Sequence, residues 1–255
     1  MKILFTICGR AGSKGIKNKN IRMFCGMPLP YYSLAVIDML KQTDMDCEYD
    51  VVINSDSKEL IELMKANPFG DVQVINREEN LGGDAVPKIA VIQDCLVRTE
   101  ASTGKKYDIV IDLDITSPLR TVSDLYRLIK KHLETGADVT TSVADSRRNP
   151  YFNMLKKTEH GYKKVIESNY TARQQAPEMF DMNASLYAYN PQYLFTGKGV
   201  LDGYCECIKM YDTGILDLDH ENDFELMEVI AQYLFEKNAD FAALYGYLKE
   251  HYSER

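Results

Sequence analysis

The chain opens with an apolar run that leads into a glycine-rich basic loop, Ile3-Leu4-Phe5-Thr6-Ile7-Cys8-Gly9-Arg10-Ala11-Gly12-Ser13-Lys14-Gly15-Ile16-Lys17-Asn18-Lys19-Asn20. The apolar run predicts a buried β-strand, so the loop should leave the carboxyl end of a central sheet. The glycines let the backbone turn sharply and approach a ligand, while the basic residues supply positive charge around exposed amide groups. This combination suits a polyphosphate, although the composition alone fits a solvated basic loop equally well.

The glycine spacing excludes two common phosphate-binding loops. The nucleotide-hydrolase loop requires a glycine, four residues and then Gly-Lys-Ser or Gly-Lys-Thr, whereas Gly12 is followed by Ser13-Lys14. The dinucleotide fingerprint requires Gly-x-Gly-x-x-Gly opening into a helix, and the glycines here are Gly9, Gly12 and Gly15. The loop therefore belongs to another class of phosphate site, or to none.

Downstream of the loop, hydrophobic patterning predicts strands alternating with helices. Strands are expected at 2–7, 50–54, 72–75, 108–113 and 139–143, and helices at 29–41, 57–65, 84–98, 122–134 and 221–237, with a capping box from Thr121 to Asp124. Strands separated by helices imply parallel pairing with right-handed crossovers. Ligands of such sheets bind beyond the carboxyl ends of the strands, where the loops at 9–20, 76–84 and 114–120 begin.

Composition sets the broad class of the protein. The 255 residues, 45% of them hydrophobic, can form a single α/β domain over residues 1–255. We expect a cytoplasmic protein, because the sequence has neither a membrane-length apolar stretch nor a signal-peptide layout. The six cysteines lack zinc-site spacing and predict reduced thiols, with Cys205 and Cys207 on a strand. The net charge of −8 argues against nonspecific nucleic-acid binding.

Four segments, taken in order, resemble motifs of the acylneuraminate cytidylyltransferases, which make CMP-sialic acid and related CMP-sugars. They are the loop from Arg10 to Asn20, the segment Thr116-Ser117-Pro118-Leu119-Arg120, the pair Arg173-Gln174-Gln175 and Asn183-Ala184-Ser185-Leu186-Tyr187, and Asp217-Leu218-Asp219. The resemblance spans residues 3–235. It implies a Rossmann-like, mostly parallel sheet flanked by helices, of the nucleotide-diphospho-sugar transferase type, with a dimerisation arm.

The resemblance also implies an activity. The anomeric hydroxyl of a nine-carbon 2-keto-3-deoxy acidic sugar would attack the α-phosphate of CTP, giving a CMP-sugar and pyrophosphate, with Mg²⁺ on the phosphates and Asp219 or a metal-bound water assisting deprotonation. Sialic, legionaminic and pseudaminic acids all fit, and departures from the sialic acid pattern favour a bacterial relative that uses a sugar such as legionaminic acid. Two alternatives stay open: a nucleotidyltransferase for another sugar such as Kdo, and a noncatalytic nucleotide-binding homologue.

The family motifs transfer nucleotide contacts to this chain. The resulting set is Arg10, Gly12, Ser13, Lys14, Lys19, Asn20, Arg77, Asp84, Asp114, Thr116 and Ser117. Arg10 and Lys19 are the catalytic candidates, and Lys19 is the residue expected to stabilise charge on the α-phosphate as pyrophosphate leaves. The family has a serine where this chain has Lys88, and Gln-Pro where it has Asp114-Ile115, so the contacts with the base are open at both positions.

Two carboxylate pairs could hold magnesium. Asp217 and Asp219 point to the same side if the chain there is extended, although an aspartate before the helix at 221–237 could equally be its N-cap. The family's metal-binding aspartates fall at this Asp-x-Asp, which favours Asp217 and Asp219 as metal ligands and catalytic residues. The rival pair is Asp112 and Asp114, and Asp114 could instead contact the cytosine amino group.

The segment 145–182 interrupts the alternation of strands and helices. Loops of this length in a compact domain usually carry function or contact a partner. In the resembled family the region is a dimerisation arm that reaches the neighbouring subunit's site, so we expect a homodimer. The acidic sugar pocket would contain Arg173, Gln174, Gln175, Asn183 and Tyr187, the arginine pairing with the sugar carboxylate.

Overall fold

The computed structural model describes residues 1–12, 15–83, 86–213, 218 and 220–252. Its strands are β1 (Lys2–Cys8), β2 (Met23–Phe24), β3 (Met27–Pro28), β4 (Glu48–Ser55), β5 (Gln73–Asn76), β6 (Ile109–Leu113), β7 (Val139–Asp145), β8 (Leu155–Thr158), β9 (Gly161–Lys164), β10 (Phe180–Tyr189) and β11 (Cys205–Lys209). The α-helices are α1 (Tyr31–Met39), α2 (Lys58–Lys65), α3 (Lys88–Thr103), α4 (Val122–Thr135), α5 (Glu221–Lys237) and α6 (Ala239–His251). Short 3₁₀ helices are η1 (Lys19–Ile21), η2 (Leu40–Gln42), η3 (Glu79–Leu81), η4 (Arg173–Gln175) and η5 (Tyr193–Phe195).

Within the described ranges, seven strands form the central sheet in the order β11-β7-β10-β6-β1-β4-β5. Every neighbouring pair is parallel except the two made by β10, which runs antiparallel between β6 and β7. The mostly parallel α/β class predicted from the sequence is therefore confirmed. The carboxyl ends of β1, β4, β5 and β6 meet at one edge of the sheet.

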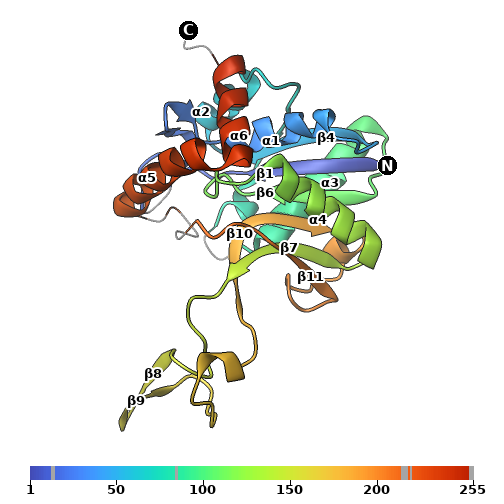
Figure 1. Cartoon of the computed structure of the whole chain (residues 1–255). Helices are drawn as coiled ribbons and strands as arrows, with labels where there is room; N and C mark the ends of the chain where they lie inside the picture. Colours follow the sequence, from blue (N-terminus) through green and yellow to red (C-terminus); the bar gives the residue numbers. More distant parts are fainter. Residues whose placement is uncertain (13–14, 84–85, 214–217, 219, 253–255) are drawn as a thin grey trace.

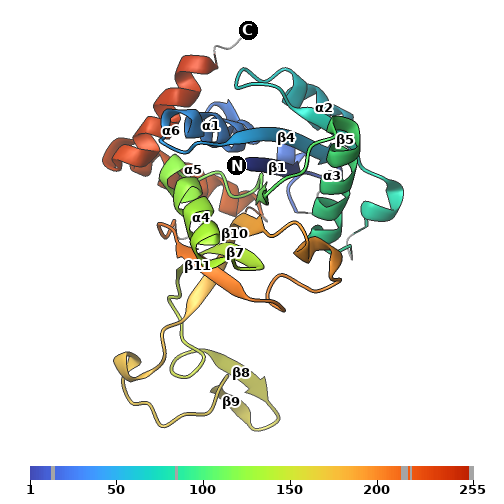
Figure 2. The same cartoon turned by 90° about the vertical axis from the view of Figure 1, so that its right-hand side faces the viewer.

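Helices cover both faces of this sheet because its strands are apolar on both sides. Ile3, Phe5 and Ile7 of β1 belong to a core shared with α1, α2, α4, α5 and α6. Leu4 faces the opposite way, into a second core formed with α3 and η5. A continuous apolar run, rather than an alternating one, is typical of a strand buried on both faces. Figures 1 and 2 show the helices on either side of the sheet.

The predicted elements are recovered with shifted ends that have local causes. Helix α3 begins at Lys88 rather than at residue 84, because Pro87 is in an extended conformation at its N-cap, and it runs on to Gly104, which ends it at φ 70°. Helix α1 likewise begins only after Pro30. The capping box of α4 is confirmed: the Thr121 hydroxyl accepts from the Asp124 amide at 3.2 Å, and the Asp124 carboxylate accepts from the Thr121 amide at 2.9 Å.

An arm extends away from the body between β7 and β10, and the antiparallel hairpin of β8 and β9 lies at its far end (Figures 1 and 2). Its two stems are joined by pairing of Asp145 with Phe180. Two side chains of the hairpin are largely exposed, Leu155 at 60% and Tyr162 at 70%. The arm therefore offers apolar surface that the body does not cover.

Two further expectations concern cysteines and membranes. All six cysteines lie within the described ranges and are free thiols, and Cys205 and Cys207 lie on β11, as predicted. In the part of the chain that the structure describes, no helix combines the length and the apolar character needed to cross a membrane.

Candidate active site

A cavity of about 390 Å³ lies at the carboxyl ends of the central strands. The three loops predicted to converge there supply most of its wall. Its lining residues are Cys8, Gly9, Arg10, Gly15, Lys19, Asn20, Arg77, Leu81, Gly83, Val86, Lys88, Val91, Asp114 and Thr116. Six of the predicted nucleotide contacts are thus brought together: Arg10, Lys19, Asn20, Arg77, Asp114 and Thr116.

The basic loop is tied to the sheet at its start. The Gly9 amide donates to the Asn54 carbonyl at 3.1 Å, and the Ala11 amide donates to Asp56 Oδ1 at 2.7 Å. A Cβ added at Gly9 would lie 2.5 Å from Leu60 Cδ2 and 2.9 Å from Ile115 Cδ1. Glycine is therefore required here by close packing, and this packing sets the path of the loop.

Asn20 and Arg77 also contribute side chains to the wall of the cavity. Asn20 Nδ2 donates to the Arg10 carbonyl at 3.2 Å, which links the two ends of the loop. Arg77, just after β5, donates from Nε to Asn54 Oδ1 at 2.7 Å and from Nη2 to the Asn54 carbonyl at 3.1 Å. The cavity lining thus includes three cations, Arg10, Lys19 and Arg77. Such a lining can bind an anion.

The other charged group of the cavity is an ammonium held between two carboxylates. Lys88 Nζ lies 2.7 Å from Asp112 Oδ2 and 2.6 Å from Asp114 Oδ2. The remaining oxygen of each aspartate is also bound: Asp112 Oδ1 accepts from Thr6 Oγ1 at 2.8 Å, and Asp114 Oδ1 accepts from the Thr116 amide and hydroxyl at 3.0 and 2.9 Å. The three charged side chains form one connected unit, here called the Lys88 unit.

The pKa shifts in the Lys88 unit favour its charged forms. Burial acts to lower the pKa of Lys88, but the charges of Asp112 and Asp114 outweigh it and raise that pKa well above its ordinary value. Burial acts to raise the pKa of Asp114, yet the Lys88 charge and the Thr116 hydrogen bonds lower it to about 2. The ammonium and the Asp114 carboxylate are therefore both ionised at neutral pH.

This arrangement does not fit a divalent metal at the rival pair of aspartates. An ammonium already lies against one oxygen of each carboxylate, and a cation there would be repelled by Lys88. Among the described residues, no cluster of three histidine, cysteine, aspartate or glutamate side chains could hold a metal ion. The predicted ligands Asp217 and Asp219 lie outside the described residues, as do Ser13, Lys14 and Asp84. The N-cap of α5 is His220, whose amide donates to Asp223 Oδ2 at 2.8 Å.

Arg120 fixes the backbone beneath the Lys88 unit. The Arg120 side chain is fully buried. Its Nε donates to the Ser117 carbonyl at 3.0 Å, and its Nη1 donates to the Ser185 carbonyl at 3.1 Å. Its Nη2 donates to the Asp114 carbonyl. Burial lowers the pKa of Arg120 to about 10. The side chain remains a cation at neutral pH, and it joins the loop after β6 to the neighbouring strand β10.

The other predicted residues that the structure describes do not line this cavity. Gly12, at φ 73°, and Ser117 belong to the loops beside it. Arg173, Gln174 and Gln175 form η4 in the arm, where Arg173 Nη2 donates to the Ser146 carbonyl at 2.8 Å.

Two predicted sugar contacts lie on β10. Asn183 is buried there, and its Oδ1 accepts from Ser142 Oγ at 2.6 Å. The Tyr187 ring lies 5.9 Å from Lys88 Nζ, which places it beside the cavity. The five predicted sugar contacts are thus divided between the arm and the sheet.

No pattern in the sequence indicates that Lys88, Asp112 and Arg120 lie close together. Lys88 stands out in the sequence because the family has a serine there, and Asp112 stands out as part of an alternative metal-binding pair. The sequence separation of 24 residues between Lys88 and Asp112 hides their contact. One signal in the sequence does point to such a contact. Lys88 and Asp114, which carry opposite charges, both stand at positions where the family has neutral residues.

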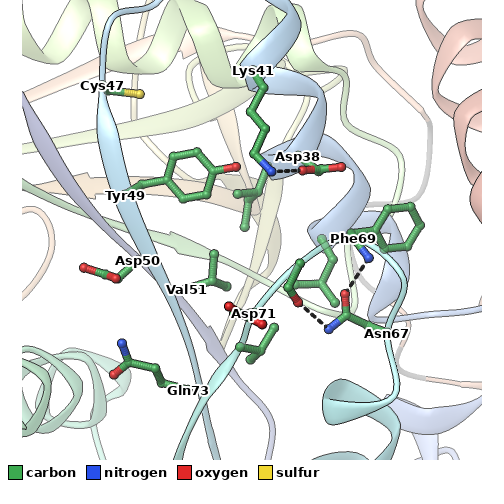
Figure 3. Close-up of a pocket in the computed structure, with 14 residues that line it drawn as sticks. Asp38, Lys41, Cys47, Tyr49, Asp50, Val51, Asn67, Phe69, Asp71 and Gln73 are labelled. Carbon is green, nitrogen blue, oxygen red and sulfur yellow. Dashed lines mark hydrogen bonds and ion pairs between the residues drawn. The ribbon is translucent and has the colours of Figure 1, made fainter.

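A larger cavity, about 570 Å³, lies away from this edge, between α1, the start of β4 and the loop at 67–73. Figure 3 shows Lys41 paired with Asp38, at 2.5 Å, close to the ring of Tyr49. Another carboxylate of the lining, Asp50, binds Lys105 and Tyr107. Asp38, Lys41 and Asp50 are thus held in ion pairs and hydrogen bonds within the protein. These structural contacts account for the charged residues that line this cavity.

Comparisons with known proteins agree with this geometry. A family profile described as Cytidylyltransferase matches residues 4–240. The chain is 32% identical over 237 residues to the post-translational flagellin modification protein B of Campylobacter coli, covering 93% of this chain and 97% of that protein. It is 33% identical over 229 residues to the CMP-N,N'-diacetyllegionaminic acid synthase of Campylobacter jejuni, covering 90% and 94%. The solved structure of CMP:2-keto-3-deoxy-manno-octonic acid synthetase complexed with CTP aligns with a TM-score of 0.62 and 15% identity, covering 92% of this chain and 100% of that one, which shows a shared fold.

Proposed function

We propose that this chain, which belongs to the cytidylyltransferase family, transfers CMP from CTP to the anomeric hydroxyl of a nine-carbon 2-keto-3-deoxy acidic sugar. Family membership confirms both the resemblance described above and the nucleotidyltransferase class. The observation that carries the proposal is the cavity at the strand ends, whose lining combines three cations with polar and apolar side chains. A nucleoside triphosphate combines a polyanion with a polar, flat base in the same way.

The chemistry is an in-line exchange at the α-phosphorus of CTP. The sugar oxygen forms a bond to that phosphorus, the bond to the pyrophosphate oxygen breaks, and the hydroxyl proton passes to a base, for which Asp219 is the candidate. Negative charge grows on phosphate oxygens as pyrophosphate leaves. Arg10 and Lys19, on the wall of the cavity, supply fixed positive charge there, and positioning with electrostatic stabilisation accounts for most of the catalysis.

Magnesium remains part of the proposal. When bound, Mg²⁺ neutralises charge on phosphate oxygens, and it prefers carboxylate ligands. The Lys88 unit is a poor site for it, which leaves Asp217 and Asp219 as the proposed ligands. Asp217→Asn should remove the magnesium dependence of the reaction, and a normal magnesium response in that variant would count against this assignment.

The acceptor is proposed to be a bacterial acidic sugar of the legionaminic type. One relative is named for CMP-N,N'-diacetyllegionaminic acid and another for flagellin modification. The proposed acceptor contacts are Arg173, Gln174 and Gln175 of the arm together with Asn183 and Tyr187 of β10, and an arginine can pair with the sugar carboxylate.

A homodimer is proposed to complete the acceptor site. Exposed apolar side chains gather on the arm, among them Leu155, Tyr162 and Phe180. Aromatic side chains are enriched at protein–protein interfaces. Equilibrium sedimentation should give twice the mass of the chain, and Leu155→Glu combined with Tyr162→Glu should give a monomer. A wild-type monomer at micromolar concentration would refute the dimer.

The activity is tested by pyrophosphate release. CTP, UTP and ATP are each combined with legionaminic, pseudaminic, N-acetylneuraminic and 2-keto-3-deoxy-octonic acids in the presence of magnesium. We expect release with CTP and a nine-carbon acid, and we expect Lys19→Ala to abolish it. Lys17→Ala is the matched control, because Lys17 is an exposed lysine of the same loop. CTP binding without release for any acceptor would identify a noncatalytic homologue.

A further inference from the structure

The cavity lining combines three kinds of group. Arg10, Lys19 and Arg77 supply positive charge, Leu81, Val86 and Val91 are apolar, and Lys88 and Asp114 belong to the Lys88 unit. A triphosphate carries its charge at one end and a flat, edge-polar base at the other. Electrostatics therefore orients the phosphates toward the arginines and the base toward the Lys88 unit.

The Lys88 unit presents a donor and an acceptor side by side. An ammonium has three hydrogens. Lys88 Nζ donates one to Asp114 Oδ2 at 2.6 Å and forms an ion pair with Asp112 Oδ2 at 2.7 Å. Among the described residues no third carboxylate pairs with Lys88, and its side chain is 36% exposed where it lines the cavity, so the ammonium can donate to a ligand there. Asp114 is 22% exposed, and its Oδ2 can accept a second hydrogen bond beside the one from Lys88.

The spacing and charge of these two groups match one pyrimidine. Cytosine offers a ring nitrogen acceptor, N3, next to a 4-amino donor. The ammonium of Lys88 and the carboxylate of Asp114, joined at 2.6 Å, are the complementary donor and acceptor. Uracil has the reverse pattern, an N3 hydrogen next to a carbonyl oxygen, so both contacts would be repulsive.

We propose that Lys88 and Asp114 read the Watson–Crick edge of cytosine, with Lys88 donating to N3 and Asp114 accepting from the 4-amino group. The inference rests on the proposed use of CTP, and it makes Lys88 a specificity-determining residue at a position where the family has serine. Adenine shows the same edge pattern as cytosine, so this pair discriminates against UTP, and rejection of ATP depends on the size of the base.

The surroundings hold the reading pair in place before a nucleotide binds. Asp112 is 0% exposed and is fixed by Thr6, while Thr116 holds the second oxygen of Asp114. Arg120 binds the Asp114 carbonyl from below. Preorganised donors and acceptors lose little freedom on binding, which strengthens discrimination.

The test measures nucleotide binding without any acceptor, by isothermal titration calorimetry. CTP, UTP and 3-deaza-CTP, which has a carbon in place of N3, are titrated into the wild type and Lys88→Met. A good pair of base contacts changes affinity by roughly 5- to 160-fold. We expect wild-type protein to lose that much on changing CTP to 3-deaza-CTP or UTP. We expect Lys88→Met to bind CTP and 3-deaza-CTP alike, because the contact that 3-deaza-CTP lacks is already gone.

The matched control is Lys105→Met. Lys105 also bridges two carboxylates, Glu48 at 3.0 Å and Asp50 at 2.8 Å, but it lies outside the cavity. This variant should keep the full loss with 3-deaza-CTP. If Lys88→Met does not fold, the double variant Lys88→Met with Asp112→Asn, which removes a charge of each sign, takes its place.

In the binding experiment, either of two results would overturn the inference: wild-type protein that binds CTP and 3-deaza-CTP equally, or a Lys88 variant that keeps the full loss with 3-deaza-CTP. Failure of the proposed function looks different. N3-dependent binding of CTP without pyrophosphate release would retain the reading pair and reject the transfer reaction. Release with CTP and UTP at equal rates would retain the transfer and reject the reading pair.

Discussion

Replacing Arg120 by methionine should destabilise the protein by an amount that follows from its hydrogen bonds. The side chain is fully buried and donates to three carbonyls. Ser185 keeps a partner after the change, because its carbonyl also accepts from the Asp114 amide at 3.2 Å. The carbonyls of Asp114 and Ser117 lose the guanidinium. A buried polar group left without a partner costs about 1–3 kcal/mol, so Arg120→Met should lower the free energy of unfolding by about 3 kcal/mol.

Equilibrium unfolding in urea, followed by circular dichroism, measures this loss, and thermal unfolding should shift downward by about 6–12 °C. Arg120→Lys separates charge from geometry, since lysine keeps the charge but lacks the planar fork that reaches both carbonyls. The control is Arg98→Met, whose side chain is 38% exposed, pairs with Asp94 at 3.4 Å and donates to the Asn76 carbonyl at 2.9 Å, an exposed contact that water can replace. It should cost about 0–1 kcal/mol. If Arg120→Met costs no more than Arg98→Met, the carbonyl argument is wrong.

Two further substitutions test the packing and the protonation described above. Gly9→Ala should lower the free energy of unfolding by about 1–3 kcal/mol and weaken CTP binding, because the added methyl group meets Leu60 and Ile115; calorimetry and urea unfolding measure both effects. His132, buried against Thr140, has its pKa lowered by burial from 6.5 to about 4. Below pH 6.5 the unfolded chain binds the proton first, so stability falls by about 3 kcal/mol between pH 6.5 and 4. His132→Gln should lack that component of the pH dependence.

Each of these substitutions has a control in the same chain. Gly246→Ala introduces a methyl group with no atom within 4 Å, inside α6, and should stabilise the protein slightly, by up to about 1 kcal/mol. A Gly9→Ala variant as stable as Gly246→Ala would contradict the packing argument. His160 is exposed, and His160→Gln should leave the pH profile of stability unchanged. Identical profiles for wild type and His132→Gln would show that His132 is not the titrating group.

The helices and parallel strands could be predicted because their signals are local. The strand β1 is mostly apolar, with Ile3, Leu4, Phe5 and Ile7 in its interior, and Thr121 caps α4 through contacts within three residues. Helix α6 was not predicted, although Phe241, Leu244 and Leu248 carry its buried face at helical spacing. In that case the pattern was present in the sequence.

Strand β10 was harder to predict, for a physical reason. Its buried positions include Asn183 and Ser185, and Ala184 has φ 49° within an irregularity of the pairing. Polar side chains and a left-handed residue are unusual in a central strand, so local pattern argues against it. Tertiary pairing with β6 and β7 overrides that preference.

The cavity at the strand ends could be predicted to the extent that it is built from loops following strands. Arg10, Arg77 and Thr116 come from three such loops and line one cavity. The Lys88 unit could not be derived in this way, because it depends on the distance between the start of α3 and the end of β6. Pairwise contacts between side chains of separate elements are properties of the folded chain.

The stems of the arm have a consequence for how this protein can diversify. The chain leaves the sheet at Asp145 and returns at Phe180, and these two residues face one another across paired strands. The intervening segment behaves as a module with fixed attachment points, so its length and sequence can change while the sheet keeps its register. Selection can therefore change the arm while the cavity at the strand ends is inherited intact, and laboratory exchange of arms between relatives can follow the same boundary.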